Sequence, residues 1–295
     1  MCCTGVTVQL TIKLNNKINY CIGRRSMTMD KIFVAIDDSE DSLRVLAFGQ
    51  SFAAQLEADL SAVSVVLNKH EIATRRSTLK ARLANHHNEN IAIDVVAHDS
   101  AKEYLGEIAS REDAGLCMMA HGRRPVPEML IGSVTAGVVR RAQRPVYLCG
   151  PRYDGLIHQR VDVLAVCIDG SKLSEQILPY ASVLAKRLGA RLQLLQVIDT
   201  AAARKPTMLG YTDVMESAYL TALARRVEKE QGHEVDWEVL HGDPADSIVS
   251  YLADSHNTML AMTTHGRSGL SQVVAGSVSH EVLHETSCPV AVLRP

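Results

Sequence analysis

The chain has 295 residues, 46% of them hydrophobic, and is about twice as long as a typical single domain. Two domains are therefore the first expectation. A formal net charge of −2 and a pI near 6.6 remove the bulk electrostatic attraction that a non-specific nucleic-acid or membrane-surface binder needs. No apolar run reaches the roughly 20 residues required to cross a bilayer. We expect a cytoplasmic protein with neither a nucleic-acid nor a membrane partner.

Residues 1–29 are predicted to be an N-terminal extension outside the folded domains. They contain no acidic residue and lack the apolar core and small-residue cleavage site of a secretory signal. Met27 and Met29 stand immediately before the first strong apolar run, so each offers an alternative start of translation.

The rest of the sequence is an internal duplication. Residues 31–39 (KIFVAIDDS) match residues 162–171 (DVLAVCIDGS). His121-Gly122-Arg123 followed by Gly132-Ser133-Val134 recurs as His265-Gly266-Arg267 followed by Gly276-Ser277-Val278. The duplication predicts domains at residues 30–150 and 161–295 with a linker at 151–160. The second copy is about 12 residues longer between its motifs, and we expect the extra residues within 199–219.

Each copy begins with an unbroken apolar run rich in Val and Ile, which is typical of a strand buried on both faces of a parallel sheet. Ser171 is expected to begin, and Gly189 to end, the helix that follows in the second copy. Further strands are predicted at 60–67, 91–97, 116–120 and 145–148, and at 191–198, 235–240, 259–263 and 289–293. The alternation predicts an α/β fold of two tandem, doubly wound, five-stranded parallel sheets.

Two glycines separated by nine residues recur where ligands bind in such sheets, beyond the carboxyl ends of the strands. Gly122 and Gly266 follow the fourth strand, and Gly132 and Gly276 precede the next helix. A glycine at each end lets the backbone approach an oxyanion, and the following serine adds a hydroxyl to the unpaired N–H groups of the first helical turn. The pattern predicts a phosphate-binding loop in each copy. A purely structural interpretation is that Gly-Ser only begins a helix.

Residues after the first two strands complete the predicted pocket. Asp37 and Asp169 follow the first strand, where they are placed to accept hydrogen bonds from a nucleoside. Val65 and Val197 offer apolar contact from the second strand. A base-and-ribose pocket is needed because a helix dipole contributes only about 0.3 to 1 kcal/mol, whereas micromolar affinity requires roughly 8 kcal/mol.

These motifs, each closed by an Arg-Pro-Val or Cys-Pro-Val strand, resemble the ATP-binding branch of the universal stress proteins over residues 30–150 and 161–295. The resemblance implies a fold like that of the adenine nucleotide alpha hydrolases. It also implies a stress-response regulator or sensor that binds ATP, with Mg²⁺ accompanying the triphosphate. The family pattern has one more glycine in the loop, where this chain has Met119 and Thr263.

The resemblance assigns site residues in both copies. In the second copy it places Asp169 and Val197 at the adenine and ribose, and it places the phosphates near Thr263, His265, Gly266, Arg267, Gly276, Ser277 and Val278. In the first copy the corresponding residues are Asp37, Val65, Gly122, Arg123, Gly132, Ser133 and Val134. Asp38 replaces a glycine there, so the first site is the less regular one. Pairing of terminal strands is also implied, giving an internal pseudo-dimer or a homodimer.

Two other functions fit the same residues. A slow ATPase or nucleotide-transferring enzyme would use His121 or His265 as an acid or base, although we predict no dedicated catalytic residue. The sequence lacks the lysine-containing phosphate loop of fast ATPases. A tandem scaffold without a ligand is the other alternative. No metal site is predicted, because His280 and His284 supply too few ligands for zinc.

Overall fold

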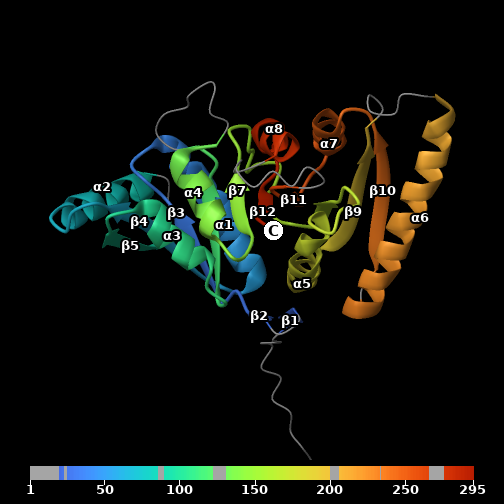
Figure 1. Ribbon diagram of the computed structural model, residues 1–295. Coiled ribbons are helices and arrows are strands. Elements are labelled where there is room, and N and C mark those ends of the chain that lie inside the picture. Colours follow the sequence, from blue (N-terminus) through green and yellow to red (C-terminus); the bar gives the residue numbers. More distant parts are fainter. Residues whose placement is uncertain are drawn as a thin grey trace, which may run out of the picture.

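A computed structural model describes residues 20–22, 25–85, 90–121, 131–199, 206–232, 234–265 and 276–295. Its main feature is a ten-stranded sheet with strand order β10-β9-β8-β11-β12-β7-β6-β3-β4-β5. The two ends of this sheet lie beside α2 and α6 (Figure 1). Within the ranges given above, no helix has both the length and the apolar character needed to cross a membrane.

The first half of the sheet contains five parallel strands with helices between them. The strands are β3 (Lys31–Ala35), β4 (Asp59–Val66), β5 (Ala92–Ala97), β6 (Ala114–Met119) and β7 (Val146–Cys149). The helices are α1 (Glu40–Leu56), α2 (Glu71–Asn85), α3 (Ala101–Ala109) and α4 (Ser133–Arg141). A short antiparallel pair, β1 (Tyr20–Ile22) and β2 (Arg25–Met27), precedes this half.

The second half repeats the same order. Its strands are β8 (Val163–Cys167), β9 (Arg191–Ile198), β10 (Val235–His241), β11 (Thr258–Thr263) and β12 (Val290–Leu293). Its helices are the 3-10 turn η1 (Ser174–Ile177), α5 (Leu178–Leu188), α6 (Pro206–Gln231), α7 (Pro244–Leu252) and α8 (Ser277–Glu285). The predicted tandem α/β architecture is therefore confirmed.

The two halves join through their last strands. β7 pairs with β12 antiparallel, with Tyr147 opposite Ala291 at the centre of the register. All other pairings within the ten-stranded sheet are parallel. One antiparallel junction between two parallel halves relates them by an approximate two-fold axis, so their strands end at opposite edges of the sheet. The chain forms the internal pseudo-dimer that the sequence suggested.

Two apolar layers cover the faces of the sheet, and each layer continues across both halves. One layer packs α1, α2, α5 and α6 on the sheet, and the other packs α3, α4, α7 and α8. At the junction the alternate residues Tyr147 and Cys149 enter the first layer, while Val146 and Leu148 enter the second. Because both cores cross the junction, the halves share their main source of hydrophobic stabilisation.

The helix after β8 begins and ends near the predicted residues. Ser171 accepts the N–H of Ser174 through its hydroxyl at 3.1 Å, and the chain then forms the turn η1 before α5. Gly189 ends α5 with φ of +63°, a left-handed conformation that glycine adopts without a steric penalty. In the region of the predicted insertion, α6 has 26 residues whereas its counterpart α2 has 15. The added length of the second half is thus largely helical.

The segment between the halves packs tightly against both of them. Arg44 of α1 donates to the carbonyl oxygens of Pro151 at 3.0 Å and Tyr153 at 2.6 Å. The side chains of Tyr153 and His158 are 3% and 2% exposed. His158 Nδ1 accepts the N–H of Thr258 at 3.2 Å, and this geometry requires the neutral imidazole.

Burial lowers the pKa of His158 to about 4. An unfolded chain takes up this proton near pH 6.5, so the unfolded state binds more protons than the native state between pH 6.5 and 4. The unfolding free energy should therefore fall by about 2 kcal/mol on this account between pH 7 and pH 5. Urea unfolding of the wild type and of His158→Gln across this range measures the effect. We expect the stability difference between them to shrink as the pH falls, and an unchanged difference would contradict the assignment.

Candidate functional site

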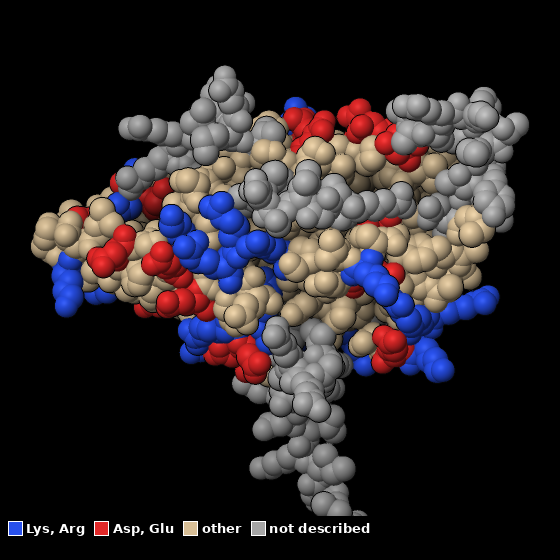
Figure 2. All heavy atoms as spheres, viewed as in Figure 1, with Lys and Arg blue, Asp and Glu red and all other residues tan. Residues whose placement is uncertain are grey.

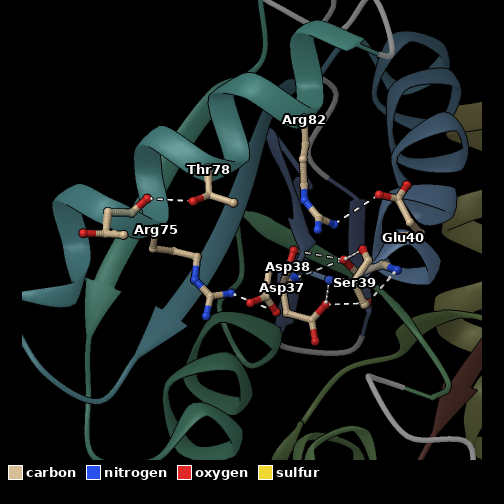
Figure 3. A network of polar contacts seen from close by, with 9 residues as sticks. Asp37, Asp38, Ser39, Glu40, Arg75, Thr78 and Arg82 are labelled. Atoms are coloured by element: carbon tan, nitrogen blue, oxygen red, sulfur yellow. Dashed lines mark hydrogen bonds and ion pairs between the residues drawn. The ribbon is translucent and has the colours of Figure 1, made fainter.

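A compact turn follows the first strand of each half. In the first half, Asp37 Oδ1 accepts the backbone N–H of Ser39 at 2.8 Å and its hydroxyl at 2.5 Å (Figure 3). The hydroxyl of Ser42 accepts the N–H of Asp37 at 3.1 Å and donates to the carbonyl of Ser39 at 2.9 Å. This network fixes the backbone at the carboxyl end of β3 and holds the Asp37 carboxylate in place.

The same turn recurs at the end of β8 with one difference. Asp169 Oδ1 accepts the N–H of Ser171 at 2.9 Å, and Ser174 repeats the role of Ser42. Gly170 has φ of +81°, whereas Asp38 at the equivalent position has no positive φ. Asp38 instead forms an ion pair with Arg75 of α2, in which Oδ1 lies 3.5 Å from Nη1 (Figure 3). The first half therefore replaces a permissive glycine with an ion pair.

The sheet register brings each aspartate level with a valine of the neighbouring strand. Ala35 pairs with Val63, and Cys167 pairs with Leu195. Continuing each register by two residues places Asp37 level with Val65, and Asp169 level with Val197. Both valines are half-buried at the carboxyl ends of their strands. In the sheet, β3 lies between β4 and β6, and β8 lies between β9 and β11. The chain leaves these central strands toward opposite sides, and open α/β sheets bind ligands at such a point.

The two ends of each candidate phosphate loop are held together by one backbone hydrogen bond. Gly132 donates its N–H to Ala120 O at 2.8 Å, and Gly276 donates to Thr264 O at 2.6 Å. A Cβ atom on residue 276 would lie 3.2 Å from that carbonyl oxygen, a tight contact. The glycine therefore allows the strand end and the helix start to approach closely.

The helices after these loops begin without a side-chain cap. Gly132 and Gly276 are the N-cap residues of α4 and α8, and neither helix has a side-chain hydrogen bond at its cap. Ser133 and Ser277 are exposed residues of the first turn, so the N-cap of each helix is the glycine of the Gly-Ser pair and not the serine. N–H groups of the first turn have no partner within the helix, and they remain available to an anion.

Four more of the predicted site residues lie at the end of β11 or at the starts of α4 and α8. Thr263 is buried and donates its hydroxyl to His265 O at 2.9 Å. His265 is 8% exposed, and its Nδ1 lies 2.8 Å from the hydroxyl of Thr264. Val134 is 39% exposed, while Val278 is half-buried. Gly122, Arg123, Gly266 and Arg267 lie outside the described residues.

Three histidines from both halves meet beside the end of β6. The rings of His121 and His284 have centroids 6.1 Å apart. The pKa of His280 lies below its usual value because burial and the neighbouring rings of His121 and His284 disfavour its charged form. No three His, Cys, Asp or Glu side chains are arranged to hold a metal ion in the part of the chain that the structure describes.

Hydroxyl groups that were not among the predicted residues support the site. Thr135 of α4 donates to Met119 O at 3.0 Å, and Ser279 of α8 donates to Thr264 O at 3.3 Å. These bonds tie each helix start to the end of the preceding strand. The signal was present in the duplication, because Thr135 and Ser279 occupy the same position of the repeat, as do Ser42 and Ser174.

The sequence profile described as the universal stress protein family matches residues 67–150 and 161–294. The chain therefore belongs to the universal stress protein family. The universal stress protein YxiE of Bacillus subtilis is 28% identical over 145 residues, which are 44% of this chain and 97% of that protein. The universal stress protein Rv2005c of Mycobacterium tuberculosis is 32% identical over 191 residues, which are 63% of this chain and 63% of that protein.

Solved structures agree on the fold. A universal stress protein from Archaeoglobus fulgidus superimposes with a TM-score of 0.65 at 22% identity, covering 91% of this chain and 99% of its own. The protein PA1789 of Pseudomonas aeruginosa, described as functionally unknown, has a TM-score of 0.58 at 18% identity, with coverages of 90% and 93%. At these identities the similarity establishes the tandem fold.

Replacing Ser174 with alanine tests the strand-end turn. The substitution removes the acceptor of the Asp169 N–H and the donor to Ser171 O, and it should lower the unfolding free energy by about 1 to 3 kcal/mol. Ser277→Ala, at an exposed position, should change it by less than about 0.5 kcal/mol. Urea unfolding of both variants gives the comparison, and equal effects would refute the role of this turn.

Proposed function

We propose that this protein binds ATP at two sites, one in each half, and acts as a stress-response regulator through the occupancy of those sites. The observation that supports the proposal most strongly is the repeated arrangement of Gly132 beside Ala120 and Gly276 beside Thr264. In both halves a helix start that has no side-chain cap is held against the end of a strand that neighbours the aspartate's own strand in the sheet. Family membership is consistent with this function.

Phosphates would bind at the starts of α4 and α8. The N–H groups there point out of the helix, and the positive end of the helix dipole favours an anion. The exposed hydroxyls of Ser133 and Ser277 add a donor in the first turn of each helix. Mg²⁺ would accompany the triphosphate and retain several of its waters, as this ion usually does in phosphate sites.

The nucleoside would bind over the ends of the first two strands. A carboxylate has acceptor capacity for about four hydrogen bonds, so Asp37 and Asp169 can serve a ribose hydroxyl as well as the serine N–H groups they already accept. Val65 and Val197 offer apolar surface to the base. Together these contacts would supply the affinity that the phosphates alone do not.

Released nucleotide tests the proposal directly. We expect the purified protein to yield about two ATP per chain on denaturation, measured by chromatography. Gly132→Val and Gly276→Val should each lose one of the two, because the larger side chains obstruct the helix starts, and each variant is the control for the other. Absence of nucleotide, together with no calorimetric signal on adding magnesium-ATP, would contradict the proposal and favour a scaffold without a ligand.

The first site should bind more weakly than the second. Asp38 adds a carboxylate beside the site and fills the position where Gly170 takes a left-handed conformation. Asp38→Gly should therefore tighten binding at the first site by roughly 3- to 10-fold, a change of less than 1.4 kcal/mol. Calorimetric titration of magnesium-ATP into Gly276→Val, with and without Asp38→Gly, isolates that site. Equal or weaker binding after the substitution would contradict this expectation.

A further inference from the structure

A cavity of about 460 Å³ lies between the two halves, away from the residues assigned to the nucleotide sites. It is bounded by the end of α4, by η1 and the first turn of α5, and by the residues after β12. The polar side chains that line it are Arg140, Arg141, Gln143, Gln176, Tyr180 and Arg294. Figure 2 shows Lys and Arg side chains gathered on the face where α4 lies in Figure 1.

The approximate two-fold axis gives this cavity a counterpart on the other side of the junction. Alignment of the repeats places Arg140 level with His284, Arg141 with Glu285, and Gln176 with Arg44. At the counterpart, the linker runs through the equivalent space, and Arg152 pairs with Glu285 at 2.6 Å. The linker also places the Tyr153 ring 6.3 Å from Phe48, the counterpart of Tyr180.

The course of the backbone explains why the counterpart is filled by the linker while the cavity is open. A Cβ atom on Gly150 would lie 2.0 Å from Leu283 O, so the chain after β7 passes directly against the end of α8. Arg294 takes the position of Gly150 in the second half, and its guanidinium reaches over to donate to Arg140 O at 2.8 Å. The linker thus fills the space on one side of the junction, and on the other side arginine side chains line an open cavity.

The three guanidinium groups that line the cavity are only partly neutralised by their surroundings. Nη2 of Arg141 lies 3.3 Å from Oε1 of Glu103. Both side chains are substantially exposed, so solvent weakens the interaction and the pair neutralises little charge. Within the described ranges, neither Arg140 nor Arg294 forms an ion pair with a carboxylate. The end of α4 offsets part of this charge, at most about half an elementary charge. Pro295 also lines the cavity, and its terminal carboxylate offsets one further positive charge. Three guanidinium groups against one carboxylate and the helix end still leave a net positive cavity.

We propose that this cavity binds a small anion with two phosphoryl groups. A guanidinium group can donate two parallel hydrogen bonds to the oxygens of one phosphoryl group. The amides of Gln143, beside the arginines of α4, and of Gln176, from η1, can add further hydrogen bonds. The volume lies in the range of small-ligand sites. The inference does not depend on ATP binding, because no residue of either nucleotide site lines the cavity.

Calorimetric titration with sodium pyrophosphate, at low salt and without magnesium, tests the proposal. Arg140→Gln combined with Arg294→Gln should weaken binding at least tenfold. The matched control is Arg160→Gln combined with Arg191→Gln, which removes two positive charges at exposed positions elsewhere and should leave binding within about twofold. Gly132→Val combined with Gly276→Val should also retain binding, since it alters only the nucleotide sites.

Three results would overturn the proposal. They are no detectable binding to the wild type, unchanged binding in the Arg140 and Arg294 double variant, and loss of binding in the double glycine variant. The last would place pyrophosphate in the nucleotide loops. Far-ultraviolet circular dichroism and the melting temperature of each variant establish that a lost signal reflects the cavity. As a second measurement, Arg140→Lys with Arg294→Lys keeps the charge but not the paired donors, and should give intermediate affinity.

Discussion

The antiparallel pairing of β7 with β12 is the interaction on which the rest of the structure depends. Without it, each half would expose the edge of a five-stranded sheet, with unpaired N–H and C=O groups. With it, the sheet continues through the molecule, and an apolar layer extends over each face. Because the junction is antiparallel, the carboxyl ends of the two sets of strands, and hence the two candidate nucleotide sites, lie at opposite edges.

Further contacts across the junction strengthen this arrangement. Gln55 of α1 bonds both the N–H and the C=O of Val161, and it also donates to Leu188 O at 2.8 Å. Arg187 of α5 donates to Leu56 O at 3.2 Å. Such bonds to buried backbone groups are costly to lose. A ligand that stabilised one half would therefore act on a body that includes the other, and this would be a physical basis for the proposed regulation by occupancy.

The sequence predicted the parts of the site that depend on local pattern. The strand ends follow from apolar periodicity, and the duplication marked both them and the nine-residue glycine spacing twice. Gly189 followed from backbone preference alone, because its counterpart in the first half is Glu57. The sequence did not predict that Gly132 and Gly276 are the N-cap residues of α4 and α8, because either residue of a Gly-Ser pair can be the N-cap. Burial of His158 and the arginine cavity depend on contacts between halves that are far apart in sequence.

The two halves differ where they meet and at the candidate nucleotide sites. Asp38 replaces the counterpart of Gly170, and the linker fills one side of the junction while arginines line the other. The helices α2 and α6 at the ends of the sheet also differ in length, with 15 and 26 residues. We infer that the duplicated fold was retained while its two halves became unequal.

Hydrogen–deuterium exchange with and without magnesium-ATP tests the central claim, that both strand-end sites hold nucleotide. If both sites hold nucleotide, exchange should slow at residues 37–42, 132–136, 169–174 and 276–280 and change little in β5 and β10 at the ends of the sheet. Unchanged exchange in all four segments at saturating magnesium-ATP, or protection confined to other parts of the chain, would contradict it.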